Sequence, residues 1–209
     1  MKLSRVQSRG EEIANSVSHI AGGALALAGT VLLIVRARGV GEVMGAIVFG
    51  FGMIMLYTMS ALYHAFREGS TVKRVFQRFD HIGIYLLIGG TFAPIFILVI
   101  EKPLGWFLLL GQWTIIVLGI VFKAVRIRRF ALLHLTLFLL LGWSGLTLVG
   151  PLYATSAAAF WLILAGGISY TIGVLFYAFD WFKFAHFVWH VFVFLGTLLH
   201  FFAIYSCLM

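Results

Sequence analysis

The chain has 209 residues, of which 62% are hydrophobic and only 11% are charged, and its mean hydropathy is +1.06. These values exclude an ordinary soluble domain and are typical of a protein that crosses a membrane several times. The formal net charge is +8, but the basic residues are concentrated in short segments between apolar runs, so we expect no nucleic-acid partner. The single cysteine, Cys207, excludes an intramolecular disulfide framework and a cysteine-rich metal site.

Helices are predicted rather than a β-barrel, and only these two architectures pair every backbone polar group inside a lipid bilayer. The apolar runs without charge are about 20 residues long, as spanning helices require. Barrel strands would instead show alternating polarity over about 10 residues. We therefore predict an all-α bundle of seven transmembrane helices that forms one domain over residues 1–209. The predicted spans are 13–35, 43–66, 79–100, 104–122, 130–150, 157–179 and 184–207.

The spans are separated by charged or turn-forming segments. Residues 130–179 carry no formal charge and are too many for one helix, so we divide them at Gly150-Pro151 and Thr155-Ser156. The first span is predicted to be retained rather than cleaved as a signal peptide, since its apolar run is too long. The other separating segments are 36–38, 67–78, 101–103, 123–129 and 180–183.

Basic residues are distributed unevenly between the two sides of the predicted bundle. The N-terminal segment and the loops after spans two, four and six carry 12 of the 15 lysines and arginines. The positive-inside rule therefore predicts a cytoplasmic N-terminus and an external C-terminus. These residues are Lys2, Arg5, Arg9, Arg67, Lys73, Arg74, Arg78, Lys123, Arg126, Arg128, Arg129 and Lys183.

The stretch His186-Phe-Val-Trp-His190 opens the last apolar run. Four residues apart on a helix, its two imidazoles lie on one face and one turn apart, at a spacing that a single metal ion can bridge. An ionisable pair inside a transmembrane segment is a candidate functional site. Six of the seven histidines fall near the predicted cytoplasmic end of the bundle. Only His200 lies elsewhere, about 15 Å further along the seventh span.

A third imidazole at the same level comes from His64, at the end of the second span. Three imidazoles with an open position for water are typical of catalytic zinc, which also needs a nearby carboxylate. Asp80, at the start of the third span, is the predicted carboxylate. Ser60 shares the helix face of His64 one turn deeper, where its hydroxyl is placed to bond a water at the metal. The prediction is thus a Zn²⁺ site with ligands His64, His186 and His190, and with Asp80 and Ser60 in catalytic roles.

Structural alternatives stay open for several of these residues. His81, His134 and His200 are interpreted as packing or interfacial histidines, without an assigned role. Asp80 is also compatible with the N-cap of the third helix. The spacing of the histidine pair in the last span also occurs at helix interfaces without a metal. A basic cluster is interpreted as an anchor to anionic lipids, and it comprises Arg126, Arg128 and Arg129.

Four motifs that occur in order along the chain together resemble the hemolysin III branch of the progestin and adipoQ receptor family. The resemblance covers essentially the whole chain. It implies seven helices with the N-terminus inside, zinc held by three histidines, an aspartate touching the zinc-bound water and a serine beside it. In this chain the implied zinc ligands are His64, His186 and His190, the implied aspartate is Asp80, and the implied serine is Ser60. Glu12, Asn15 and His19 match a supporting network near the site. The motifs are Glu12-Ile-Ala-Asn15 with His19, Ser60-Ala-Leu-Tyr-His64, Phe79-Asp80-His-Ile-Gly-Ile with Gly90-Thr-Phe-Ala-Pro94, and His186-Phe-Val-Trp-His190.

Related receptors are associated with ceramide hydrolysis, and the wider superfamily to which they look similar includes alkaline ceramidases. The resemblance therefore implies a zinc-dependent hydrolase of a lipid amide or ester, placed in the bacterial inner (plasma) membrane, with membrane lipids as substrate or ligand. The outer loops are too short to bind a large extracellular protein. Two alternatives stay open: a non-enzymatic membrane-homeostasis or sensor protein with a structural zinc, and a hemolysin-type membrane-disrupting protein. An ion transporter is disfavoured because the outer half of the predicted bundle carries few polar groups.

Overall fold

The computed structural model describes residues 6–125, 130–179 and 181–207, and every regular element within these ranges is helical. Seven helical segments are long and apolar enough to cross a membrane, which confirms the predicted all-α class with seven spans. Which end faces the cytoplasm stays a prediction, and the predicted lipid anchor at 126–129 lies outside the described residues. The elements are α1 (Arg9–Arg36), α2 (Val40–Ala65), α3 (Thr71–Leu98), α4 (Leu104–Val125), α5 (Ala131–Trp143), the 3-10 helix η1 (Ser144–Leu148), α6 (Val149–Thr155), α7 (Ala157–Phe179) and α8 (Ala185–Cys207).

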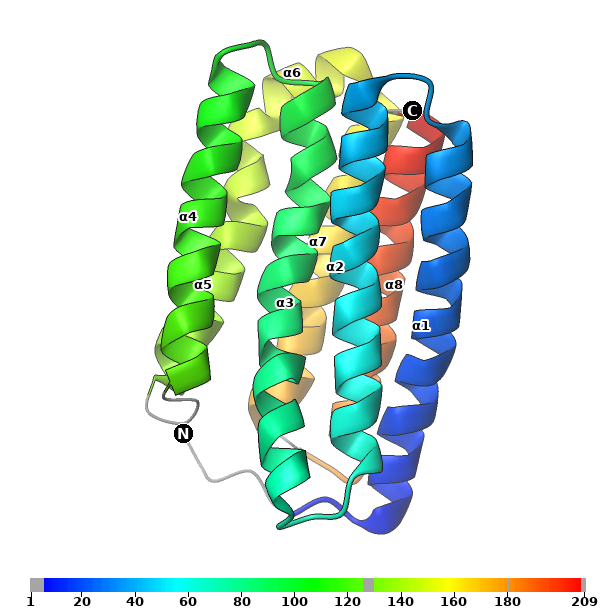
Figure 1. Ribbon diagram of the computed structural model, residues 1–209, viewed down its shortest axis with the longest axis vertical. Coiled ribbons are helices and arrows are strands. Elements are labelled where there is room, and N and C mark those ends of the chain that lie inside the picture. Colours follow the sequence, from blue (N-terminus) through cyan, green and yellow to red (C-terminus); the bar gives the residue numbers. More distant parts are fainter. Residues whose placement is uncertain (1–5, 126–129, 180, 208–209) are drawn as a thin grey trace.

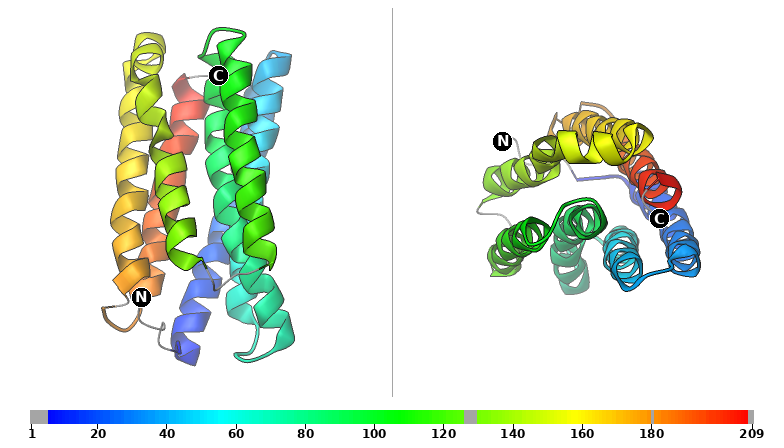
Figure 2. Two further views of the ribbon diagram at one scale, coloured as in Figure 1. Left: turned by 90° about the vertical axis from the view of Figure 1, so that its left-hand side faces the viewer. Right: turned by 90° about the horizontal axis from the view of Figure 1, so that it is seen from above.

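The long helices follow one another in chain order around a ring, which is seen end-on in Figure 2. Contact between α1 and α8 closes the ring, and α3 reaches across it to α8 and α5. The starts of α1, α3, α5 and α8 lie at the lower end of the bundle in Figure 1, with the ends of α2, α4 and α7. This lower end is called the site end below, because the predicted ligands lie there.

Two serines start helices before the apolar runs begin. The hydroxyl of Ser8 accepts from the backbone N–H of Glu11, whose carboxylate accepts the backbone N–H of Ser8 at 2.9 Å, a capping box for α1. Ser70 caps α3 by accepting the backbone N–H of Lys73 at 3.1 Å. Helix α3 therefore begins at Thr71, well before the predicted start at residue 79. Asp80 thus lies inside a helix, and the alternative that made it an N-cap is wrong.

The fifth span is not one regular helix. The chain passes from α5 through the 3-10 turn of η1 into α6 and stays helical up to Thr155. Pro151 lies in the first turn of α6, where its missing N–H costs little, so the helical path does not break at Gly150-Pro151. The path breaks at Ser156, whose hydroxyl accepts the backbone N–H of Ala159 at 3.1 Å as α7 begins.

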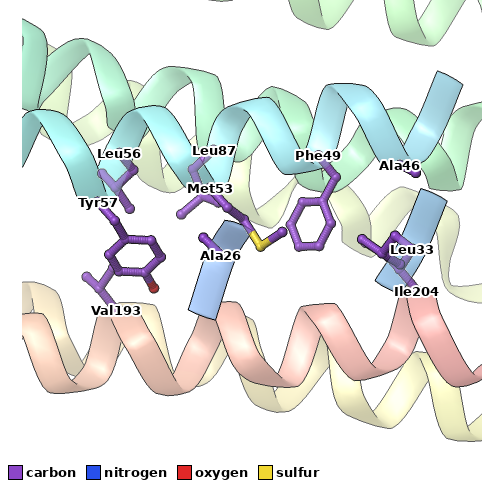
Figure 3. Packing of buried hydrophobic residues seen from close by; sticks show 10 residues of the cluster. All are labelled: Ala26, Leu33, Ala46, Phe49, Met53, Leu56, Tyr57, Leu87, Val193 and Ile204. Carbon is purple, nitrogen blue, oxygen red and sulfur yellow. The ribbon is translucent and has the colours of Figure 1, made fainter. Parts of the chain in front are cut away.

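The main core lies between α1, α2, α3 and α8 (Figure 3). Phe49, Met53 and Tyr57 follow one another at four-residue intervals on α2, and their side chains point toward α8. Val193 and Ile204 of α8 are buried in the same cluster. Since lipid tails are as apolar as these side chains, close van der Waals packing rather than transfer from water holds the helices together. This packing fixes the rotation of the helices that carry the predicted ligands.

The most extensive helix contact, between α2 and α3, depends on glycine. A Cβ atom on Gly52 would lie 2.5 Å from the backbone oxygen of Leu86. A Cβ atom on Gly83 would lie 2.8 Å from the Cα atom of Leu56. Both obstructing atoms belong to the backbone, so a side chain at either position forces the two helices apart.

Gly52→Ala is therefore expected to destabilise the folded bundle by about 1–3 kcal/mol, the usual cost of overpacking. Thermal unfolding of detergent-purified protein measures the effect. Gly111→Ala on α4 is the matched control, because nothing lies within 4 Å of its added Cβ atom. The control should keep or slightly raise stability, by up to about 1 kcal/mol from helix propensity. Equal losses in both variants would contradict the proposed backbone contact.

Candidate metal centre

Three histidines from two helices meet at the site end. His64 lies in the last turn of α2, and His186 and His190 lie in the first turns of α8. One ring nitrogen of each lies within 4.8 Å of those of the other two. The ring centroids of His186 and His190 are 4.7 Å apart, and that of His64 is 5.1 Å from both. The structure thus brings together the three residues that the sequence placed at one level.

Glu12 links this cluster to a buried lysine. Its Oε2 atom lies 2.7 Å from Nδ1 of His64, and its Oε1 atom accepts from Nζ of Lys73 at 2.8 Å. The same ammonium donates to the backbone oxygens of Tyr63 and Phe66 at the end of α2. Sequence reasoning counted Lys73 only among the loop cations that set topology. The structure shows it buried as the counter-ion of Glu12, which no spacing rule indicated.

The rest of the predicted supporting network also lies on α1. The ring of His19 stacks on that of His190 with 3.6 Å between centroids. The side-chain amide of Asn15 donates to Gln7 at 2.6 Å. Ser18, which sequence reasoning missed, lies with its Oγ atom 3.2 Å from Nδ1 of His190. Nothing in the sequence distinguishes Ser18 from its neighbouring serine on α1, because only the rotation of α1 against α8 brings it to the ring.

Asp80 and Ser60 line the same cavity as His186 and His190. The side chain of Asp80 is 16% exposed, and its Oδ2 atom lies 3.4 Å from Nδ1 of His81. Ser60 is buried, and its hydroxyl has no hydrogen-bond partner among the described residues. The cavity wall therefore presents both a carboxylate and an unsatisfied hydroxyl beside the histidines.

The cavity is long and mostly apolar, and about 1070 Å³ of space free of protein atoms lies along it, a volume that includes its open surroundings. Its walls come from α1, α2, α3, α5, α7 and α8. On α8 it extends from His186 to His200, which is about 21 Å along a helix axis. One leaflet of a bilayer provides about 15 Å of hydrocarbon, so the lining of the cavity extends over a length comparable with one leaflet.

Unsatisfied polar atoms gather next to the histidines. Among the described residues they include Oδ1 of Asn15, both ring nitrogens of His19, the hydroxyls of Tyr57 and Ser60, and Nε2 of His64. Buried polar atoms in native proteins normally have a partner, so this concentration indicates a place where an ion, water or ligand binds. The donor set suits zinc, because three imidazole nitrogens lie close together, and no thiol joins them among the side chains that the structure describes.

The other three histidines have contacts of their own. Nδ1 of His134 lies 2.8 Å from the hydroxyl of Tyr85 on α3. His200 donates from Nε2 to a backbone oxygen of α7 at 3.0 Å. His81 donates from Nδ1 to the backbone oxygen one turn earlier on α3 at 2.7 Å. None of the three belongs to the described cluster of metal-compatible histidines.

The fold and the cluster define a class: a multi-pass helical membrane protein with a three-histidine site able to hold a metal ion. The family model described as "Haemolysin-III related" matches residues 7–201. The chain belongs to this family, and the resemblance drawn from the four sequence motifs is confirmed.

Curated relatives agree with this assignment. The chain is 36% identical to Hemolysin-3 of Bacillus cereus over 198 residues, which cover 93% of this chain and 90% of the relative. It is 37% identical to a Hemolysin-3 homolog of Bacillus subtilis (strain 168), with 93% and 92% covered. The human Monocyte to macrophage differentiation factor is 27% identical, with 95% and 84% covered. No solved structure matches the chain significantly.

Proposed function

We propose that the protein is a zinc-dependent integral-membrane hydrolase that cleaves a lipid amide or ester. The observation that carries the proposal is the meeting of three histidine nitrogens within 4.8 Å beside a long apolar cavity. Asp80 and Ser60 on the wall of that cavity add the acid–base and hydrogen-bonding groups that hydrolysis needs. A site with this composition differs from a purely structural one in having a carboxylate and a hydroxyl open to a ligand.

A bound zinc ion supplies a Lewis acid that polarises an acyl carbonyl and makes water nucleophilic near neutral pH. Asp80 accepts a proton from the attacking water and passes it to the departing amine or alcohol. The hydroxyl of Ser60 donates a hydrogen bond to the oxygen that gains negative charge during the attack. A bond forms between the water oxygen and the acyl carbon, and the amide or ester bond breaks. The products are a fatty acid and a free amine or alcohol.

The surroundings support a lipid rather than a soluble substrate. An acyl chain fits the apolar cavity, and a lipid that enters laterally between helices needs no opening to water. The excess of basic residues in the segments at the site end suggests that this end faces the cytoplasm. We therefore propose that the substrate comes from the cytoplasmic leaflet of the plasma membrane.

The direct test uses detergent-purified protein, metal analysis and a mixed membrane-lipid extract. We expect about one zinc ion per chain and new free fatty acids, detected by mass spectrometry after incubation. Protein that carries no zinc would contradict the proposal at its first step. Zinc without any released fatty acid would contradict the hydrolase and favour a structural metal.

Gly142→Leu tests whether the cavity holds the acyl chain. Gly142 lines the cavity from α5, and nothing lies within 4 Å of an added Cβ atom. A leucine side chain should occupy part of the cavity, so the released fatty acids should shift toward shorter chains at unchanged zinc content. Gly111→Leu is the control, since Gly111 has equally open surroundings on α4, which does not line the cavity. An unchanged chain-length profile in Gly142→Leu would exclude this cavity as the acyl site.

A membrane-homeostasis or sensor protein with a structural zinc is the second candidate. It is favoured by the burial of His64 and His190, which come from different helices, so that a shared metal would hold α2 to α8. In that case metal removal should lower the unfolding temperature, and no lipid should be cleaved at any stage.

A further inference from the structure

We infer that α1, which contributes none of the three histidines, sets the metal affinity of the site by fixing the tautomer and ring orientation of two of them. Glu12 acts on His64, and Ser18 acts on His190. The inference rests on the proposed metal-binding role. It deepens that role by assigning positioning residues that touch the ligands rather than the metal.

The tautomer of His64 follows from its partner. A carboxylate only accepts hydrogen bonds, so the 2.7 Å contact with Glu12 requires the proton of the imidazole to be on Nδ1. The lone pair is then on Nε2, which is buried and has no partner among the described residues. A carboxylate on the far nitrogen also makes a histidine a stronger ligand. Glu12 therefore presents the nitrogen that a cation needs.

Lys73 holds Glu12 in place. An isolated charged carboxylate this close to the bundle interior would be costly, and the ammonium at 2.8 Å from Oε1 compensates it. The other two ammonium protons go to the backbone oxygens of Tyr63 and Phe66, at 3.1 and 3.3 Å. The carboxylate is thus held on both sides, with one oxygen for the lysine and the other for the histidine.

Ser18 does the same for His190 through a different chemical group. Its hydroxyl donates to the backbone oxygen of Asn15 at 2.8 Å, which uses its only proton. With this proton used, we assign the 3.2 Å contact with Nδ1 of His190 as a hydrogen bond that the ring donates to the hydroxyl oxygen. His190 therefore has the same tautomer as His64, with its lone pair on Nε2. The stacked ring of His19, at 3.6 Å, further restricts the rotation of His190.

The test measures zinc affinity by competition with a chromophoric chelator on the full detergent-purified chain. Loss of such an orienting partner typically weakens metal binding about 10- to 100-fold, and we expect this for Glu12→Gln and for Ser18→Ala. Bound Co²⁺ should keep a tetrahedral absorption spectrum in both variants, because the three histidines are intact. Ser18→Thr keeps the hydroxyl and should restore the affinity.

Ser16→Ala is the matched control. Ser16 is buried on the same helix, and its hydroxyl donates to the backbone oxygen of Ala61 at 3.0 Å. This variant should bind zinc as tightly as the wild type. If the wild type binds no zinc, the proposed metal role fails. Suppose instead that the wild type binds zinc, and that Glu12→Gln and Ser18→Ala bind it with the same affinity as Ser16→Ala. Only the positioning role is then wrong. A loss in Ser18→Ala that Ser18→Thr does not restore would also overturn it.

Discussion

Replacing His64, His186 and His190 together by alanine is expected to remove bound zinc completely from the purified protein. Zinc in proteins is held by several nitrogen, sulfur or oxygen ligands at about 2.0–2.3 Å, and these residues provide three imidazole nitrogens from one small volume. Elemental analysis of the detergent-purified variant measures the metal. Because two of the three side chains are buried, the unfolding temperature should also be recorded. A folded triple variant that still carries one zinc per chain would show that the site lies elsewhere.

His200→Ala controls for the general loss of a buried imidazole. His200 lies on α8 like two of the proposed ligands, but it is paired to a backbone oxygen of α7 and is outside the cluster. This variant should keep its zinc, even where its stability falls. Metal loss in His200→Ala equal to that in the triple variant would mean that damage to α8, and not ligand removal, explains both results.

Asp80→Asn is expected to abolish the release of fatty acids while zinc content and the unfolding temperature stay close to the wild type. An amide cannot accept the proton from the attacking water, and general-base groups typically contribute 10²- to 10⁴-fold to the rate. The side chain keeps its size and lines the cavity without being a predicted ligand. Turnover measured by mass spectrometry, with metal analysis on the same sample, separates catalysis from metal binding.

Glu101→Gln is the matched control for removal of one carboxylate. Glu101 is an exposed acid between α3 and α4, at the end of the bundle opposite the site, and it does not line the cavity. Turnover in this variant should equal that of the wild type. Full activity in Asp80→Asn would contradict the role of Asp80 as the general base. If the zinc is structural, the wild type and both variants should all show no lipid turnover.

The seven spans were predictable because lipid imposes one simple requirement, a run of apolar residues long enough to cross it. The helix ends were less predictable, since charged residues mark the edge of the hydrocarbon and not the end of a helix. The start of α3 illustrates this, because Ser70 caps a helix whose first turns carry Lys73 and Arg74. The misplaced start led to the wrong N-cap alternative for Asp80.

For the site, residue spacing and depth were enough to bring His64, His186 and His190 together. Their role as ligands stays a proposal. Sequence reasoning did not find Ser18 or the burial of Lys73, because both depend on how α1 is rotated against α2 and α8. Side-chain orientation around a ligand is a property of packed helices, and it leaves no periodic signal in a single sequence.

The closure of the ring by α1 and α8 has a consequence for biosynthesis. The ribosome delivers His64, together with its partners Glu12 and Lys73, long before α8 emerges. The hydrogen bonds among His64, Glu12 and Lys73 can therefore form first. His186 and His190 are synthesised later, as a pair on a single helix. The metal ion would then bind only after α8 has inserted into the membrane. Metal binding would therefore mark the completed assembly of the bundle.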